Sequence, residues 1–348
     1  MNVMTGAVAD GQQERLDWID WLKGLAILFV VYGHMPFADG ESNPGKMLAY
    51  SFHMPLFFLL SGYTAALSFS HRPQVIPFCR RRVLSLMVPC VVWFLFGRYF
   101  QFAGHGGWSS DVAGMLKCML AGYGQWWFLP CMFLMQVLLA VVMAFKAVCR
   151  FKGAIIIGVM LALLFCLGCN AVLAPFFLRE YGVPVGYLVR MQHMVWPFAL
   201  GCALYWYKPL MGLILRSEWV ATAAIAAYLV SCNYGWGGMA LSGSAAGVLL
   251  VRLFAGSAPK WTNLQGVGGF VLRQLKLFGK CSMAIYVTAW IFQSEIPLMA
   301  GDGVPQILVF AFNMALSVLI AYLCVCVKQL VNTSRVASLL LFGESLKR

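Results

Sequence analysis

Apolar stretches long enough to cross a lipid bilayer recur along the whole chain. A transmembrane helix needs about 20 apolar residues, and about ten such stretches follow one another here. They lie at residues 20–37, 47–69, 83–103, 126–145, 154–178, 187–207, 213–231, 239–256, 278–297 and 305–327. The sequence therefore predicts an all-α polytopic membrane protein with about ten transmembrane helices and loops too short for a large soluble domain.

Composition excludes the other classes of fold. Hydrophobic residues make up 61% of the 348 residues and charged residues only 11%, whereas soluble domains carry about 25% charged residues. A soluble, disordered, collagen-like or small disulfide-linked chain is therefore excluded. The 12 cysteines are scattered, nearly all within apolar stretches, and we interpret them as small buried hydrophobes. They show no zinc-ligand spacing, and we expect no metal and no tightly bound cofactor.

The positive charge predicts the topology. The chain carries 25 Lys and Arg against 12 Asp and Glu, a net charge of +13. Such an excess indicates nucleic-acid binding in a soluble protein, but in a membrane protein it marks the cytoplasmic side. With the N-terminus inside, the ten stretches leave few basic residues outside: Lys46, Arg98, Lys117, Arg179 and Arg190. We therefore expect both termini in the cytoplasm, contact with the lipid bilayer and no nucleic-acid partner.

This topology divides the chain into three parts. Residues 1–19 form a cytoplasmic N-terminal tail, residues 20–328 the membrane domain, and residues 329–348 a cytoplasmic C-terminal tail. The glycine-rich run that begins at Gly266 and ends at Gly269 is not preceded by a strand. We therefore interpret it as a flexible cytoplasmic loop rather than a nucleotide-binding turn.

Ionisable residues are densest in the first apolar stretch, which contains Asp20, Lys23 and His34. Each such group costs about 2.5–3.5 kcal/mol on insertion scales, so those present are candidates for function. Lys23 and His34 share one helix face to within about 20° and lie about 16 Å apart along the axis. Gly24 is near the same stripe and leaves room for another group to approach. Two simpler interpretations stay open: Lys23 as an interfacial anchor paired with Asp20, and His34 as a residue at headgroup level.

The next two stretches add a histidine and three arginines. His53 enters the second stretch from the outer side, near the depth of His34, and Pro55 fits the first turn of a helix there. An interfacial residue at a helix start is the alternative interpretation of His53. Arg80, Arg81 and Arg82 stand together at the inner end of the third stretch. They either enforce topology or hold phosphates in their guanidinium forks.

At these residues the sequence resembles acyltransferase family 3, a group of bacterial integral-membrane acyltransferases. Within this family it is most similar to the fucose 4-O-acetylase-like subset. The strongest matches are a basic residue and a histidine ten residues beyond it, here Lys23 and His34, and the run Phe52–Phe58 that leads into Ser61–Tyr63. Further matches lie at Phe78, Arg80, Arg81 and Pro89, at Trp126–Leu129, at Arg190, Pro197, Phe198 and Gly201, and at Leu277–Lys280 with Ile285 and Tyr286. Val287, Thr288 and Ala289 follow where members often have a histidine.

The resemblance implies a reaction and a role for each residue. Such a protein moves an acyl group, usually acetyl, from cytoplasmic acyl-CoA to a hydroxyl of a cell-surface or lipid-linked glycan, in the bacterial cytoplasmic (inner) membrane. Acetyl-CoA is then a co-substrate, bound by Lys23, Arg80 and Arg81. His34 would be the general base, because its ordinary pKa suits proton transfer near neutral pH; an acyl-histidine intermediate is the alternative. Residues expected to orient His34 or bind the acceptor, each with a structural alternative, are His53, Arg190, His193, Glu295, Trp126 and Trp127.

A transporter or flippase for lipid-linked sugars is the competing interpretation. Its ionisable residues would line a path through the bilayer, and such proteins often contain inverted repeats with broken helices in matching positions. The two halves of this sequence show no convincing match of that kind. A third interpretation is an acyltransferase-like sensor without turnover. An enzyme binds acetyl-CoA and consumes it when an acceptor is present, whereas a flippase ignores it.

Overall fold

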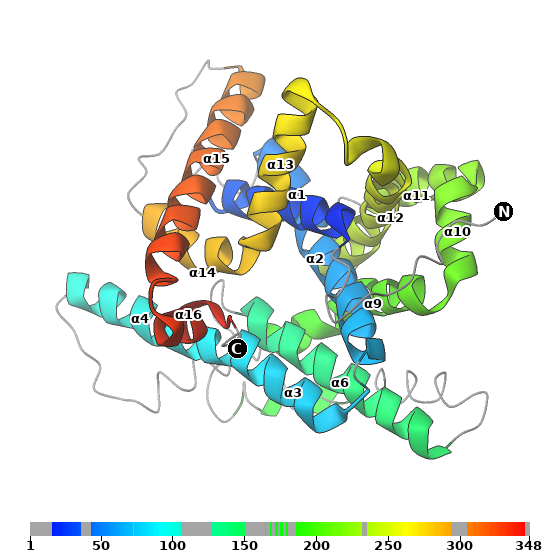
Figure 1. Cartoon of the computed structure of the whole chain (residues 1–348), viewed down its shortest axis with the longest axis horizontal. Helices are drawn as coiled ribbons and strands as arrows, with labels where there is room; N and C mark the ends of the chain where they lie inside the picture. The colour runs from blue at the N-terminus through cyan, green and yellow to red at the C-terminus, as the bar shows by residue number, and fades with distance from the viewer. Residues whose placement is uncertain are drawn as a thin grey trace.

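The computed structural model describes residues 16–35, 43–71, 73–105, 127–149, 186–231, 235–293 and 305–344, with isolated residues between 164 and 179. All regular elements named within these ranges are helices (Figure 1). They are α1 (Asp17–Gly33), α2 (Pro44–His71), α3 (Val75–Arg82), the π-helix η2 (Val83–Met87), α4 (Val88–His105), α6 (Phe128–Cys149), α9 (Gly186–Trp206), α10 (Lys208–Arg216), α11 (Glu218–Ser231), α12 (Gly235–Trp261), α13 (Gly266–Lys280), α14 (Ser282–Gln293), α15 (Gln306–Val331) and α16 (Arg335–Phe342).

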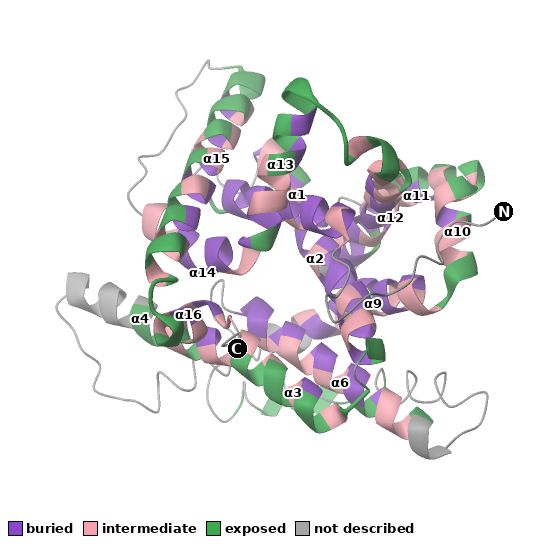
Figure 2. Ribbon diagram, in the orientation of Figure 1, coloured by how far each residue is buried: buried purple, intermediate pink, exposed green. Residues whose placement is uncertain are grey.

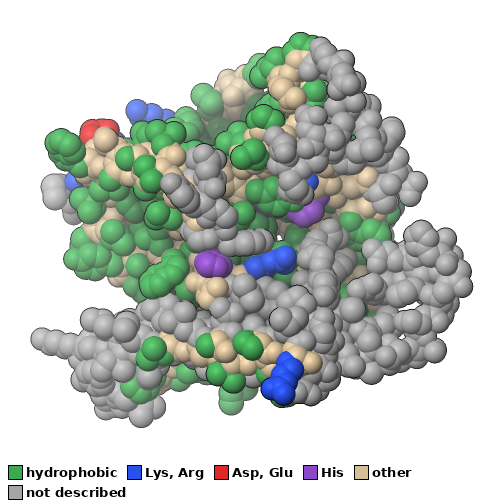
Figure 3. All heavy atoms as spheres, turned by 180° about the vertical axis from the view of Figure 1, so that it is seen from behind, with side chains coloured by type: hydrophobic (Ala, Val, Ile, Leu, Met, Phe, Trp, Pro, Cys, Tyr) green, Lys and Arg blue, Asp and Glu red, His purple; other side chains and the backbone are tan. Residues whose placement is uncertain are grey.

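Several of these helices are long and apolar enough to cross a membrane. Within the described ranges, four meet that test singly: Pro44–His71, Phe128–Lys146, Gly238–Trp261 and Gln306–Val331. Two further pairs meet it together but are sharply bent, α9 with α10 by 102° and α13 with α14 by 86°. Figure 3 shows hydrophobic side chains over much of the described surface of one face. The predicted helical membrane fold is confirmed, whereas about ten spans and cytoplasmic termini stay predictions.

Helix α1 lies within the bundle and organises it. It contacts α2, α12, α13, α14 and α15, and Figure 2 shows α1 and α2 buried along most of their length. Leu22, Ala26 and Tyr32 of α1 have no exposed surface. A helix that is apolar on almost every side is expected to be surrounded by other helices. The polar side chains of α1 are therefore held in fixed positions by packing on several sides.

Glycines set the closest helix contacts. A Cβ added to Gly24 of α1 would overlap the carbonyl oxygen of Leu275 in α13, and one added to Gly279 of α13 would overlap the carbonyl oxygen of Asp20. The space that Gly24 leaves is thus occupied by the α13 backbone. Small residues allow such close approach between membrane helices. Gly24 and Gly279 therefore fix the position of α1 against α13.

Close packing at glycines also joins α2 to α9. A Cβ on Gly62 would overlap the carbonyl oxygen of Phe198, and one on Gly201 would overlap the carbonyl oxygen of Leu59. The Cys202 thiol also donates a hydrogen bond of 3.3 Å to the carbonyl oxygen of Gly62. The two helices therefore make backbone-to-backbone contact around reciprocal glycines.

Two local expectations from the sequence are wrong. Gly266 does not open a flexible loop but begins α13, because Leu272 and Phe278 farther along the helix bury its apolar face. Pro55 does not lie in a first turn, since α2 begins at Pro44, and the ring of Pro55 instead packs against Gly243 of α12. The first helix ends at Gly33, within a few residues of the predicted end, and His34 occupies its C-cap.

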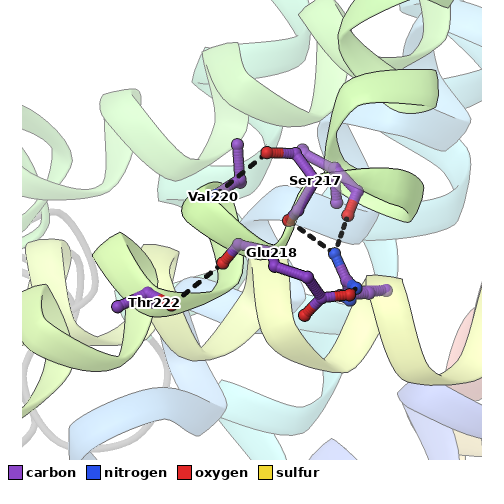
Figure 4. Close-up of polar contacts among 6 residues, drawn as sticks. Ser217, Glu218, Val220 and Thr222 are labelled. Carbon is purple, nitrogen blue, oxygen red and sulfur yellow. Dashed lines mark hydrogen bonds and ion pairs between the residues drawn. The ribbon is translucent and has the colours of Figure 1, made fainter.

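Polar contacts fasten the bent segment that contains α10 and α11. Arg252 of α12 donates from Nη1 to the carbonyl oxygens of Ile214 (3.2 Å) and Ser217 (2.6 Å), and its Nη2 pairs with Glu218. Figure 4 shows this corner, where Ser217 Oγ also accepts a hydrogen bond of 3.3 Å from the backbone N–H of Val220. Arg252 thereby binds carbonyls of the last turn and the C-cap of α10.

The region predicted as a C-terminal tail contains a docked helix. Trp93 of α4 donates a hydrogen bond of 2.7 Å from Nε1 to the carbonyl oxygen of Leu341 in α16. Gly343, at the end of α16, has φ = 64° and lies against the backbone of Ser85 in η2. Lys328 pairs with Glu344 at 2.5 Å. The predicted boundary at residue 329 is tested by none of these contacts and stays a prediction.

Candidate active site

Two adjoining cavities lie beside α1. The larger has a volume of about 180 Å³ and the smaller about 40 Å³. Val30, Met54 and Tyr286 line both, so the two cavities share a wall built from α1, α2 and α14. Together they form the candidate site.

One face of α1 runs along both cavities. Lys23, Ile27 and Val30 line the larger cavity, and Val30 and His34 line the smaller one. Residues at these spacings share one side of an α-helix. Lys23 therefore lies at one end of the joined cavities and His34 at the other, about 16 Å apart along the helix axis.

The end with Lys23 is basic. Arg82 of α3 lines the same cavity as Lys23, and no carboxylate is among the described residues that line either cavity. The Arg82 guanidinium lies over the ring of Phe78, with Cζ 4.8 Å from the ring centroid. Burial, with a smaller contribution from neighbouring Arg81, lowers the pKa of Arg82 to about 10, so it remains protonated at neutral pH. This end is suited to an anionic group.

Arg80 and Arg81, the two arginines predicted to bind the donor, are both exposed. Arg81 Nε donates a hydrogen bond of 3.3 Å to the carbonyl oxygen of Pro77 in its own helix. The cavity wall is instead reached by Arg82. Consecutive helical residues point about 100° apart, and Arg82 follows the buried apolar residue Phe78 by four positions. That spacing is the sequence signal that identifies Arg82.

The other end of the joined cavities contains two histidines. His34 is exposed at the end of α1, and its Nδ1 lies 2.8 Å from the carbonyl oxygen of Val30. A carbonyl oxygen only accepts, so Nδ1 donates and the lone pair of the neutral ring is on Nε2. His53 is buried, with Nδ1 donating to the carbonyl oxygen of Ala49. Its Nε2 has no hydrogen-bond partner in the described part of the chain.

An aromatic ring lies close to both histidines. The ring centroid of Tyr50 is 6.0 Å from that of His34 and 5.2 Å from that of His53. All three residues line the smaller cavity. The structure therefore brings together the two histidines that the sequence places at similar depth, and it adds Tyr50, which the sequence reasoning missed. Tyr50 precedes His53 by three positions, near the outer end of the second stretch, which is the signal available for it.

The remaining predicted residues are dispersed. Trp127 lines the smaller cavity, and Arg190 Cζ lies 4.8 Å over the Trp127 ring, a cation–π contact. His193 is hydrogen-bonded to the side chain of Gln192 and is not among the residues that line either cavity. Trp126 and Glu295 lie outside the described residues. The structure thus brings Trp127 and Arg190 to the His34 end.

Tyr286 lies where the two cavities meet, and the sequence analysis assigned it no role. It is 9% exposed, and its ring centroid is 5.3 Å from that of Phe128. Its place in the Ile285–Tyr286 pair of the resemblance was the available signal. The geometry as a whole offers a basic end, a mostly apolar passage and a histidine end. It fits a long ligand with an anionic head and a reactive tail.

Comparison with known proteins identifies the family. The acyltransferase family 3 model, described as an acyltransferase domain, matches residues 16–326. Nodulation protein NolL of Sinorhizobium fredii is 29% identical over 137 residues, a match that covers 36% of this chain and 36% of the relative's length. The match to the family model includes α1–α14, both cavities and most of α15. The chain therefore belongs to acyltransferase family 3.

Proposed function

We propose that the protein is an integral-membrane O-acyltransferase of the bacterial inner membrane. It transfers an acyl group, by expectation acetyl, from cytoplasmic acyl-CoA to a hydroxyl of a cell-surface or lipid-linked glycan. The observation that carries the proposal is the single face of α1 with Lys23 at the basic end of the joined cavities and His34 at the other end. The family assignment supports acyl transfer.

The donor is proposed to enter from the basic end. The phosphates of coenzyme A are held by Lys23 and Arg82, with Arg80 and Arg81 attracting the nucleotide from the exposed surface of α3. The uncharged pantetheine arm then lies along Ile27 and Val30. The distance of about 16 Å from Lys23 to His34 suits an extended arm of that kind. This direction requires the Lys23 end to face the cytoplasm, in agreement with the predicted topology.

The acyl group is proposed to transfer at the histidine end. Nε2 of His34 takes the proton of the acceptor hydroxyl, whose oxygen attacks the thioester carbonyl carbon. The carbon–sulfur bond breaks, and the departing thiolate receives the proton from His34 to leave as coenzyme A thiol. Trp127 lines the smaller cavity and is proposed to contact the acceptor sugar with the part of its ring that borders that cavity. His53, through Tyr50, and Arg190, through Trp127, are proposed to orient the reacting groups. Roles for His193, Trp126 and Glu295 stay predictions.

Turnover of labelled donor tests the proposal. The purified protein in lipid nanodiscs is incubated with [¹⁴C]acetyl-CoA and glycans from cells that lack the gene, and label in the glycan is measured. Transfer is expected with the unmodified protein and is lost in His34→Ala. His71→Ala, at the exposed end of α2, is the matched control and retains transfer.

Three results would contradict the proposal or part of it. A protein that binds lipid-linked sugar but does not consume acetyl-CoA is a flippase or a sensor. Near-normal transfer by His34→Ala excludes His34 as the base. Label that remains covalently on His34 after a quench without acceptor replaces direct transfer with the acyl-histidine route.

A further inference from the structure

A buried carboxamide faces the larger cavity and is only partly satisfied. Gln136 of α6 is 4% exposed, and its Nε2 donates a hydrogen bond of 2.9 Å to Ser61 Oγ of α2. Its Oε1 has no partner among the described residues. Both side chains line the larger cavity. An unpaired polar atom is costly to bury, so the arrangement calls for a ligand atom.

A purely structural role for Gln136, joining α6 to α2, explains only one end of its side chain. A hydrogen bond between membrane helices contributes to their association, and the bond from Gln136 to Ser61 accounts for one end of the carboxamide. The other end remains unsatisfied beside a cavity that also contains Arg82, whose Nε is likewise unpaired in the described part of the chain. The cavity therefore presents polar groups that the protein itself does not use.

The position of the pair selects one part of the proposed donor. Ser61 follows His53 by eight residues in α2, which places it about 12 Å along the helix from the histidine end. In an extended pantetheine arm, the nearer amide nitrogen is roughly 4 Å from the thioester sulfur and the farther one roughly 9 Å. Of the two amides, the farther one comes closer to the depth of Ser61 and Gln136 while the thioester stays near His34.

We propose that Gln136, oriented by Ser61, binds the amide of the pantetheine arm that is farther from the thioester. A secondary amide has one N–H donor and one carbonyl acceptor. It therefore pairs with the free end of the Gln136 carboxamide whichever way that group is turned. This inference rests on the proposed acyl-CoA donor, and it makes Gln136 a residue that recognises the arm instead of the nucleotide or the acyl group.

Donors of different length test the assignment. Acetyl-CoA and S-acetylpantetheine contain both amides, whereas S-acetyl-N-acetylcysteamine contains only the amide nearer the sulfur. In Gln136→Leu, kcat/KM is expected to fall about tenfold for the two longer donors, the typical loss for one buried hydrogen bond. It should stay within about twofold for the short donor, because the contact is absent there. Ser61→Ala keeps Gln136 but removes its orienting partner, and it should lower the same donor ratio by a smaller factor.

A second buried carboxamide provides the control. Asn313 of α15 is 1% exposed and also has an unpaired side-chain nitrogen in the described part of the chain, but it lines neither cavity. Asn313→Leu should leave the ratio of long-donor to short-donor kcat/KM unchanged. Equal losses for all three donors in Gln136→Leu would overturn the assignment and leave a structural role. A wild-type protein that uses none of the donors would overturn the proposed function and this inference with it.

Discussion

Substitution of Gly24 tests how tightly α1 is held. In Gly24→Ala, the new Cβ would lie 2.7 Å from the carbonyl carbon and 2.9 Å from the Cα of Leu275. These are backbone atoms, so no side-chain rotation relieves the overlap. Ordinary contacts begin near 3.4 Å, so α1 and α13 must separate by about 0.7 Å or more to clear the Leu275 carbonyl, which weakens dispersion contacts along both helices. Overpacking of this kind costs about 1–3 kcal/mol, of which alanine's helix propensity restores up to about 1 kcal/mol.

The assay is thermal unfolding of detergent-solubilised variants, followed by tryptophan fluorescence and far-UV circular dichroism. A net loss of about 1–2 kcal/mol lowers Tm by about 2–6 °C. Gly33→Ala, on the same helix, is the matched control, since its Cβ would meet only ordinary contacts at 3.6–3.8 Å with Ala49 and Tyr50. Its Tm should equal or exceed that of the wild type. Equal stability of Gly24→Ala and wild type would refute the close-packing argument, as would equal losses in both variants.

Other contacts predict graded effects. Arg252→Met should lower the free energy of unfolding by about 1–3 kcal/mol because the carbonyls of Ile214 and Ser217 lose their hydrogen bonds from the guanidinium. Glu218→Ala should cost less than about 1 kcal/mol, since the Glu218 side chain is 82% exposed. Chemical denaturation measures both variants. In steady-state kinetics, Arg82→Met should raise KM for acetyl-CoA more than Arg80→Met does. Equal effects would indicate that Arg80, Arg81 and Arg82 serve only to set the topology. Trp93→Phe removes the hydrogen bond to α16 and should speed limited proteolysis of that helix, which peptide mapping detects.

Much of the helical framework follows from the sequence. Apolar stretches of sufficient length predicted α2, α6, α12 and α15 within a few residues, because burial of apolar side chains determines where these helices run. The 11-residue spacing of Lys23 and His34 likewise predicted a common face, since helical periodicity alone fixes it. The glycine-rich start of α13 is helical although its composition is typical of a loop, because the helix is stabilised by tertiary contact with α1, which local composition does not reveal.

The finer geometry of the site depends on contacts between distant segments. Which of three adjacent arginines faces the cavity is decided by the packing of α3, and Arg82 does so because Phe78 on the same face is buried. The hydrogen bond between Gln136 and Ser61 joins residues 75 positions apart. No local pattern encodes such a pairing. The cation–π contact between Arg190 and Trp127 could not be predicted from the sequence for the same reason.

The central claim is that one face of α1 binds the donor at Lys23 and performs the chemistry at His34. The most direct measurement compares equilibrium binding and single-turnover transfer of [¹⁴C]acetyl-CoA for Lys23→Met and His34→Gln in nanodiscs. Lys23→Met should weaken donor binding about tenfold while the transfer rate at saturation is retained. His34→Gln should bind the donor within about twofold of wild type yet transfer at least about 100-fold more slowly. Near-normal transfer by His34→Gln would contradict the account. So would a result in which Lys23→Met and His34→Gln both lose only donor binding or both lose only the transfer rate.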